Sequence, residues 1–160
     1  MEITRVERFE ETNRDELGRM LQRSEDFPLH LDRLHLRSRS SYPTFVAWRG
    51  DAIVGLLDGA FNMDFASNRE FVEFDLPITP HALVERIYVQ PTARRAGVGG
   101  LLVAHFAMEA VRHRCLFIGG SLDLTSDVKG RRMFFARQGF AVGRFDTFGA
   151  LTADVLLTGR

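Results

Sequence analysis

The chain has 160 residues, of which 45% are hydrophobic and 26% charged, and this composition is typical of one globular domain spanning residues 1–160. A formal net charge of zero argues against nucleic acid as the main partner, and a single cysteine excludes an intrachain disulfide framework. The N-terminus has no basic region followed by an apolar run, and no eighteen-residue apolar stretch occurs. We therefore expect a cytoplasmic protein with no membrane contact.

Hydrophobic periodicity predicts strands and helices in the first half of the chain. Thr12 followed by Asp15 resembles the start of a helix, and Pro28 suits the first turn of another. Two β-rich runs separated by Gly50-Asp51 predict a hairpin. The expected elements are a strand at 2–9, a helix at 12–24, a second helix from Pro28 to before 38–41, and strands at 44–49 and 52–61.

The second half alternates strand and helix patterns, which is typical of a mixed α and β architecture. The expected elements are a short strand at 70–74, a strand at 82–90, a helix at 101–113, a strand at 115–124, a helix at 128–138, and closing strands at 140–145 and 151–157. The fold class predicted is α/β in the α+β sense, with a mixed, mostly antiparallel central sheet and helices on both faces.

A glycine-rich turn lies between the expected strand at 82–90 and the following helix. Gly97, Gly99 and Gly100 would let a ligand approach the backbone closely, and the helix that they open presents unpaired N–H groups and a positive dipole end. Arg94 and Arg95 add positive charge beside it, so the segment predicts a site for a diphosphate. A P-loop needs a lysine that is absent here, and a dinucleotide fingerprint needs glycine or alanine where Leu102 stands.

The segment 85–102, ERIYVQPTARRAGVGGLL, resembles the coenzyme-binding signature of the GNAT superfamily of N-acyltransferases, V-x-P-x-x-[RQ]-x-x-G-x-[GA]. Five residues match it position by position: Val89, Pro91, Arg94, Gly97 and Gly99. A second family pattern, an aromatic-rich helix that ends in a Gly-Phe pair, is met by residues 133–140. The two patterns together cover residues 82–140, and the order of elements extends the resemblance to both ends.

The resemblance implies a GNAT-like fold and an N-acetyltransferase that moves the acetyl group of acetyl-CoA to a primary amine by direct attack in a ternary complex. In the family, the loop amides hold the pyrophosphate, and a splayed central strand contacts the thioester and pantetheine. The residues assigned to acetyl-CoA in this way are Ile87, Tyr88, Val89, Arg94, Arg95, Ala96, Gly97, Val98, Gly99, Gly100, Phe134 and Phe135. No metal is expected.

Catalysis needs a proton acceptor, because an amine with a pKa near 10.4 is almost wholly protonated at pH 7. Glu85 is the candidate base, and simple alternation places it on the strand face of Ile87 and Val89. The alternative is a strand carboxylate that pairs with Arg86 or solvent. Phe135 stands where many family members carry a tyrosine that protonates the leaving thiolate, so Tyr88 is a candidate substitute, as are Tyr42, Ser121 and Ser126.

The nature of the acceptor is a hypothesis from charge. Residues 51–80 carry six acids and one base, whereas residues 81–160 carry six acids and eleven bases. An acidic wall at 51–80 would attract a cationic amine, and a solvated acidic face is the alternative. Phenylalanines gather where the family builds its acceptor pocket: Phe27, Phe61, Phe65, Phe71 and Phe74.

Two further alternatives stay open from the sequence. Phe135 in place of tyrosine favours a non-catalytic module that senses acyl-CoA or scaffolds a partner. A nucleotide-binding regulator is a third interpretation. Residues 151–157, as an expected final strand, offer an edge for a homodimer, and an internal strand explains them equally well.

Overall fold

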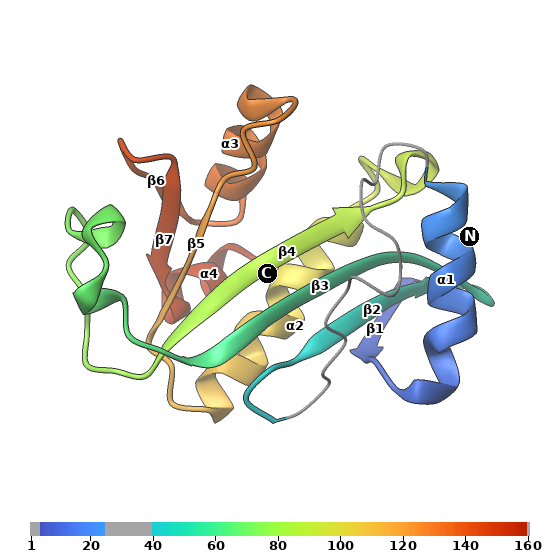
Figure 1. Cartoon of the computed structure of the whole chain (residues 1–160), viewed down its shortest axis with the longest axis horizontal. Coiled ribbons are helices and arrows are strands. Elements are labelled where there is room, and N and C mark those ends of the chain that lie inside the picture. Colours follow the sequence, from blue (N-terminus) through green and yellow to red (C-terminus); the bar gives the residue numbers. More distant parts are fainter. Residues whose placement is uncertain (1–3, 25–39, 160) are drawn as a thin grey trace.

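The computed structural model describes residues 4–24 and 40–159, which form a seven-stranded mixed sheet with helices on both faces (Figure 1). The strand order is β1-β2-β3-β4-β5-β7-β6, and β4 with β5 is the parallel pair among the described strands. The strands are β1 (Thr4–Arg8), β2 (Thr44–Arg49), β3 (Ala52–Met63), β4 (His81–Val89), β5 (Phe117–Ser121), β6 (Ala141–Val142) and β7 (Thr147–Leu151). The predicted fold class is confirmed.

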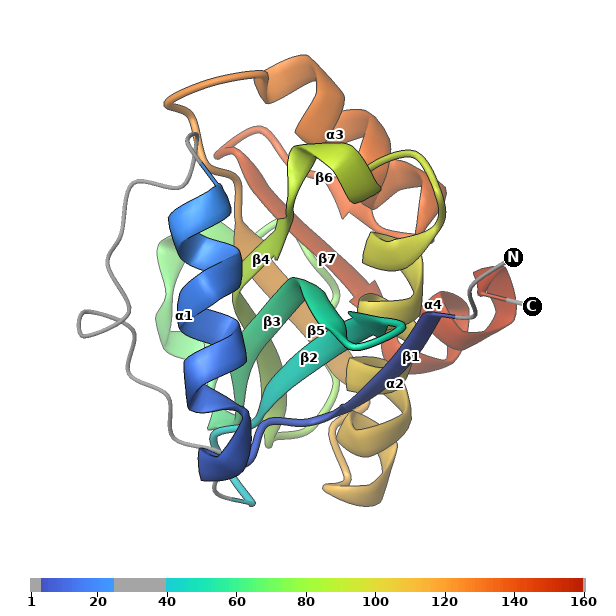
Figure 2. The same ribbon diagram turned by 90° about the vertical axis from the view of Figure 1, so that its right-hand side faces the viewer.

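The helices are α1 (Arg14–Arg23), α2 (Val98–Arg112), α3 (Val128–Arg137) and α4 (Thr152–Thr158). Figure 2 shows α1 on one side of the sheet and α2 with α4 on the other. The sequence explains this placement, because α1 buries Leu17, Met20 and Leu21 at helical spacing along one stripe. The predicted second helix from Pro28 lies outside the described residues.

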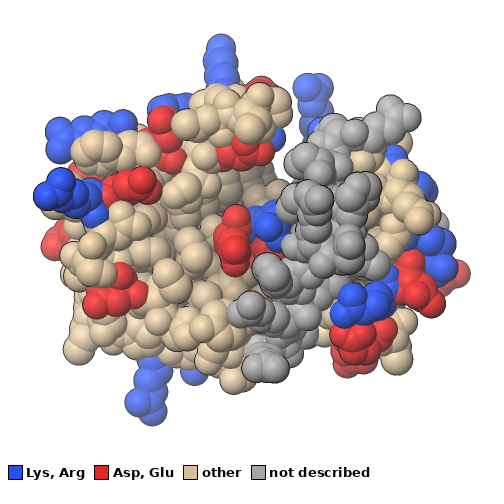
Figure 3. All heavy atoms as spheres, viewed as in Figure 1, with Lys and Arg blue, Asp and Glu red and all other residues tan. Residues whose placement is uncertain are grey.

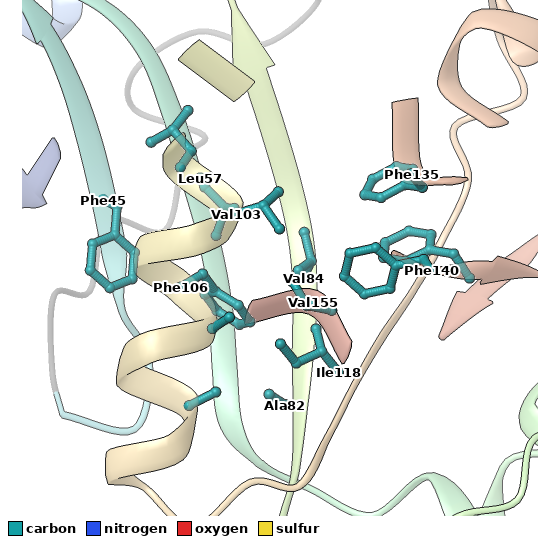
Figure 4. Packing of buried hydrophobic residues seen from close by; sticks show 14 of the residues in the cluster. Phe45, Leu57, Ala82, Val84, Val103, Phe106, Ile118, Phe135, Phe140 and Val155 are labelled. Atoms are coloured by element: carbon teal, nitrogen blue, oxygen red, sulfur yellow. The ribbon is translucent and has the colours of Figure 1, made fainter. Parts of the chain in front are cut away.

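The main core lies between the sheet and α2 (Figure 4). Phe106 of α2 is completely buried, and its ring centroid lies 6.4 Å from that of Phe45 and 5.0 Å from that of Phe61. Such aromatic contacts add to the free energy gained from burying apolar area. A second core cluster lies between α1 and the other face of β2 and β3. The sheet is thus fixed from both sides, which holds β4 in place.

The predicted strand at 70–74 is wrong. This part of the chain folds as two short 3₁₀ turns, η3 (Phe65–Ser67) and η4 (Arg69–Phe71). The side chains of Asp64 and Asn68 accept hydrogen bonds from the amides of Ala66 and Glu70, respectively, and such local bonds compete with a strand ladder.

The predicted closing strands are also corrected. Residues 140–145 contribute only the two-residue β6, and residues 152–158 form α4 instead of a strand. The helix is held at its start by Thr152, whose hydroxyl donates to the carbonyl oxygen of Cys115 at 2.7 Å. Thr152 and Val155 are buried three positions apart, which is helical spacing. Residues 151–157 therefore offer no strand edge for a homodimer.

Candidate active site

Strands β4 and β5 separate soon after they meet. Their parallel register has two pairs, Ala82 with Ile118 and Leu83 with Gly119, and Figure 1 shows the strands diverging from there. On its other side β4 stays paired with β3 as far as Val89. From Glu85 to Val89 the backbone of β4 therefore has no strand partner on the β5 side. Backbone N–H and C=O groups left in this way need other partners, such as a ligand or water.

The register between β3 and β4 shifts at Glu85. Asp58 lies opposite Arg86, but the next residue of β3, Gly59, lies opposite Val84, so one residue of β4 is extra. Such a β-bulge re-aims a side chain. Gly59 permits this close approach, because a Cβ at its position would lie 2.0 Å from the carbonyl oxygen of Leu83.

The bulge corrects the predicted face of Glu85. Val84 and Ile87 both pack in the core beside α2, although they are three residues apart. The two residues between them, Glu85 and Arg86, therefore do not follow the regular alternation of strand faces. Arg86 reaches Asp58 of β3, and Glu85 is exposed. Glu85 therefore does not share the inward face of Ile87 and Val89, which face α2.

The glycine-rich turn leads directly into α2. Gly97, with φ of +82°, precedes the helix, and a Cβ there would meet no atom of the described residues within 4 Å, so no described side chain covers its backbone. The amides of residues 95–100 make no hydrogen bond among the described residues, whereas the Leu101 amide donates to the carbonyl oxygen of Gly97. Six consecutive free N–H groups at a helix N-terminus fit a diphosphate. Residues Arg95, Ala96, Gly97, Val98, Gly99 and Gly100 supply them.

The two arginines of the turn are placed differently. Arg94 Nε donates to the carbonyl oxygen of Val89 at 2.7 Å, and its guanidinium lies 5.4 Å from the centroid of the Tyr88 ring. Arg94 thus ties the turn to the end of β4. Arg95 is exposed, and its φ of +62° is uncommon for a residue other than glycine. Tyr88 packs toward the α1 cluster, on the face opposite Ile87.

Helix α3 closes the other side of the turn. A Cβ at Gly99 would lie 2.8 Å from the ring of Phe134, so Gly99 lets α2 and α3 pack closely. Phe135 is 5% exposed and stacks on Phe148 with ring centroids 3.7 Å apart. Phe134 is within reach of the turn, whereas Phe135 lies in the core and presents little surface to a ligand.

One polar residue of the site was not singled out from the sequence. Asp58 is 6% exposed, and its Oδ2 accepts a hydrogen bond of 2.9 Å from Arg86, while its Oδ1 is buried without a partner. Burial raises the pKa of Asp58 to about 6, although the Arg86 charge acts in the opposite direction. The sequence feature that could have pointed to Asp58 is its position as the single carboxylate inside the apolar run AIVGLLDGAF.

We expect Asp58 to make the stability of the fold depend on pH. Its pKa is about 6 in the folded chain against an ordinary 3.8, so the folded state binds the proton more tightly. This contribution is present at low pH and is lost as pH rises through about 6. Between pH 4 and 7, wild type should lose about 2–3 kcal/mol of unfolding free energy relative to Asp58→Asn. Urea unfolding at both pH values measures it, and parallel behaviour of the two proteins would contradict it.

The phenylalanines predicted to line the acceptor pocket lie in several different parts of the structure. Phe65 and Phe71 stack at 4.2 Å and, with Phe117, form a third buried cluster on which Phe74 packs. A hollow of about 300 Å³ lies beside it, lined partly by Phe65, Phe74 and Leu76. Phe61 instead belongs to the core beside α2, and Phe27 lies outside the described residues.

Not all acids of the predicted acidic wall at 51–80 are free to attract a cationic amine. Asp64 caps η3, and Glu73 accepts a hydrogen bond of 2.8 Å from the amide of Arg144. Asp58 is buried. These three acids of residues 51–80 therefore have roles within the fold.

Other chemistry finds little support in the part of the chain that is described. Cys115 is fully buried, burial raises the pKa of its thiol to about 11, and Sγ donates to the carbonyl oxygen of Phe61. A thiol of this kind is a poor nucleophile. Residues 4–24 and 40–159 contain no group of three or more side chains suited to a metal ion. No helix within these ranges is long and apolar enough to cross a membrane.

Residues 40–142 match the family model described as the acetyltransferase (GNAT) domain. The chain belongs to the GNAT family. The matched region runs from before β2 to β6 and includes the splay, the bulge and the glycine-rich turn. The comparison with curated proteins finds no match.

Solved GNAT structures share the fold. The ribosomal-protein-S18-alanine N-acetyltransferase from Escherichia coli matches with a TM-score of 0.65 and 14% identity, over 92% of this chain and 91% of that one. Ard1 from Thermoplasma volcanium has a TM-score of 0.66 and 16% identity, over 92% and 97%. The aminoglycoside N-acetyltransferase AAC(6′)-Iy, in complex with CoA, has a TM-score of 0.67 and 16% identity, over 85% and 87%. At these identities the likeness concerns the fold.

Proposed function

We propose that the protein is an N-acetyltransferase that moves the acetyl group of acetyl-CoA to a primary amine by direct attack in a ternary complex. The observation that carries the proposal is the splay of β4 and β5 beside a turn with six free amides. The family model and solved relatives that include a CoA complex support it. When bound, acetyl-CoA would supply an activated acetyl thioester.

Each part of the site has a role in this proposal. The amides of residues 95–100 would hold the pyrophosphate, with the Arg95 guanidinium as an added positive charge. The backbone of Ile87 and the amide of Val89, which lack a strand partner on the β5 side, would bind the pantetheine and thioester end; the Val89 carbonyl oxygen already accepts a hydrogen bond from Arg94. Glu85, exposed at the bulge, would take the proton of the attacking amine, directly or through water. Cys115 is buried, so its thiol would not carry the acetyl group as a covalent intermediate.

The substrate proposed is a cationic primary amine. Because Asp58 is paired with Arg86, Glu85 is the free carboxylate at the bulge among the residues that the structure describes. A panel of spermidine, glucosamine and a tripeptide with a free α-amino group covers three classes of such amines. Release of free thiol from acetyl-CoA measures turnover with each. Calorimetric titration with acetyl-CoA, with ATP as control, measures binding separately.

Gly97→Val should raise the dissociation constant of acetyl-CoA at least tenfold, about 1.4 kcal/mol. A β-branched residue at a φ of +82° distorts the turn, and its side chain would occupy the space in front of the amides. Gly50→Val is the matched control, because Gly50 also has a positive φ, +59°, but lies in the β2–β3 turn. Equal affinities of the two variants in calorimetry would refute the role of the turn.

A second candidate function is an acyl-CoA-binding module without turnover. Phe135 in place of tyrosine favours it, because no hydroxyl stands at the position from which many family members protonate the thiolate. The two candidates differ in one measurement. Binding of acetyl-CoA without thiol release from any amine of the panel would favour the module, and release that needs Glu85 would favour the enzyme.

A further inference from the structure

The bulge in β4 brings one cation close to two carboxylates. Glu85 and Arg86 follow one another between Val84 and Ile87, and Asp58 lies opposite Arg86 on β3. Glu85 is therefore one residue from the position opposite Asp58, and its charge adds to burial in raising the pKa of Asp58. Figure 3 shows acidic and basic side chains together over the middle of β3 and β4, with uncharged surface beside them.

Arg86 is committed to one of the two carboxylates. Its Nη1 lies 2.9 Å from Oδ2 of Asp58. The Glu85 side chain makes no hydrogen bond or ion pair with any other described residue, and it is exposed. The sequence allowed Glu85 to be neutralised by its neighbour Arg86, and the structure places that guanidinium on β3 instead.

Stability does not explain the Asp58–Arg86 pair. The Asp58 side chain is 8% exposed, its neighbours Leu56 and Leu57 are fully buried, and one of its oxygens has no partner. Removing such a pair from water costs about as much as the attraction returns, and apolar residues of similar volume often serve as well. A costly polar group within an apolar strand is expected where function requires it.

We propose that Asp58 is a positioning residue that holds the Arg86 guanidinium away from Glu85, so that the Glu85 carboxylate stays available as a proton acceptor. The proposal rests on the proposed function, in which Glu85 is the base. Among the described residues, Glu85 is the neighbour of Arg86 on the same bulge and carries no partner of its own, so it is the carboxylate open to Arg86 once Asp58 is removed. An ion pair there would stabilise the ionised carboxylate and weaken it as a base.

The test compares Asp58→Val with the double variant Asp58→Val/Arg86→Met. Valine suits a strand interior and cannot accept a hydrogen bond from Arg86, and the double variant removes both buried charges. At pH 8, with the amine of the panel that wild type acetylates fastest, Asp58→Val should lower kcat at least tenfold. The double variant should recover kcat to within about threefold of wild type. Because removing both charges also relieves an unpaired buried cation, the position of Arg86 in a crystal structure of Asp58→Val separates a positioning role from a purely structural one. Thermal unfolding checks that each variant is folded.

The outcomes divide cleanly. Full activity of Asp58→Val, or a double variant as slow as the single one, would overturn the proposal. If Asp58→Val does not fold, the double variant still tests the proposal. Its kcat should be near that of wild type, and an inactive double variant would overturn the proposal.

A crystal structure of Asp58→Val at pH 8 supplies a readout without turnover. The guanidinium of Arg86 should lie within 4 Å of the Glu85 carboxylate, and an Arg86 that stays directed at position 58 would overturn the proposal. Should wild type acetylate no amine of the panel, the proposed function fails, while this structural result still decides the role of Asp58. If Asp58→Val does not fold and wild type is inactive, both proposals are refuted: Glu85 is not the base of an acetyltransferase, and Asp58 has no base to keep available.

Discussion

We expect Glu85→Gln to lower kcat by about 10²- to 10⁴-fold, the range typical of general base catalysis. Glutamine keeps the size and polarity of the side chain on the bulge but cannot accept the proton of the amine. Binding of acetyl-CoA should change less than twofold, because the six free amides lie in the turn after β4 and not at Glu85. Steady-state thiol release and calorimetry measure the two effects separately.

The residual rate of Glu85→Gln should depend on pH. Below a pKa near 10.4, the neutral fraction of an amine rises about tenfold for each unit of increase in pH. The kcat of the variant should therefore rise as the pH is raised toward 9. Glu7→Gln is the matched control, because Glu7 is also an exposed glutamate on a strand, β1, at the far side of β2 and β3. Similar kcat values for wild type and Glu85→Gln would show that the amine loses its proton elsewhere.

Phe106→Ala should destabilise the fold by about 3–5 kcal/mol. Phe106 is completely buried, and its ring packs against Phe45 of β2 and Phe61 of β3, so its loss leaves a cavity between α2 and the sheet. The same helix carries the glycine-rich turn at its N-terminus. Urea unfolding of the purified variant at pH 7 measures the change in unfolding free energy.

Met108→Ala is the control on the same helix. Met108 is 43% exposed, so its truncation should cost much less than that of Phe106. A loss below 1 kcal/mol for Phe106→Ala would mean that the core beside α2 closes around the missing ring. That result would contradict the close packing seen between α2, β2 and β3.

The local features of the site could be predicted from the sequence. The turn after β4 depends on glycines within a few residues of one another, and the hairpin of β2 and β3 depends on Gly50-Asp51 between two apolar runs. Both are set by backbone conformations that short segments determine themselves. The order of strands and helices from β4 to α3 followed from periodicity, which is strong in those segments.

The features that were predicted wrongly, or not at all, depend on contacts between distant parts of the chain. Alternation assigned Glu85 to the face of Ile87, but the bulge arises from the pairing of β4 with β3 and the close approach at Gly59. The pairing of Asp58 with Arg86 joins residues 28 positions apart. The run at 151–157 is too short for periodicity to separate strand from helix, and contacts of Thr152 with the segment before β5 decide it.

The two-pair junction of β4 and β5 links ligand occupancy to the free energy of the fold. Among the described residues, only two pairs join the antiparallel strands β1–β4 to the strands β5, β7 and β6 within the sheet. A ligand that bonds to the exposed backbone of β4 would bridge part of this break and would bind the folded chain alone. At a hundred times its dissociation constant, such a ligand adds about 2.7 kcal/mol to the unfolding free energy. The cellular concentration of the ligand would thereby set part of the thermal resistance of the protein.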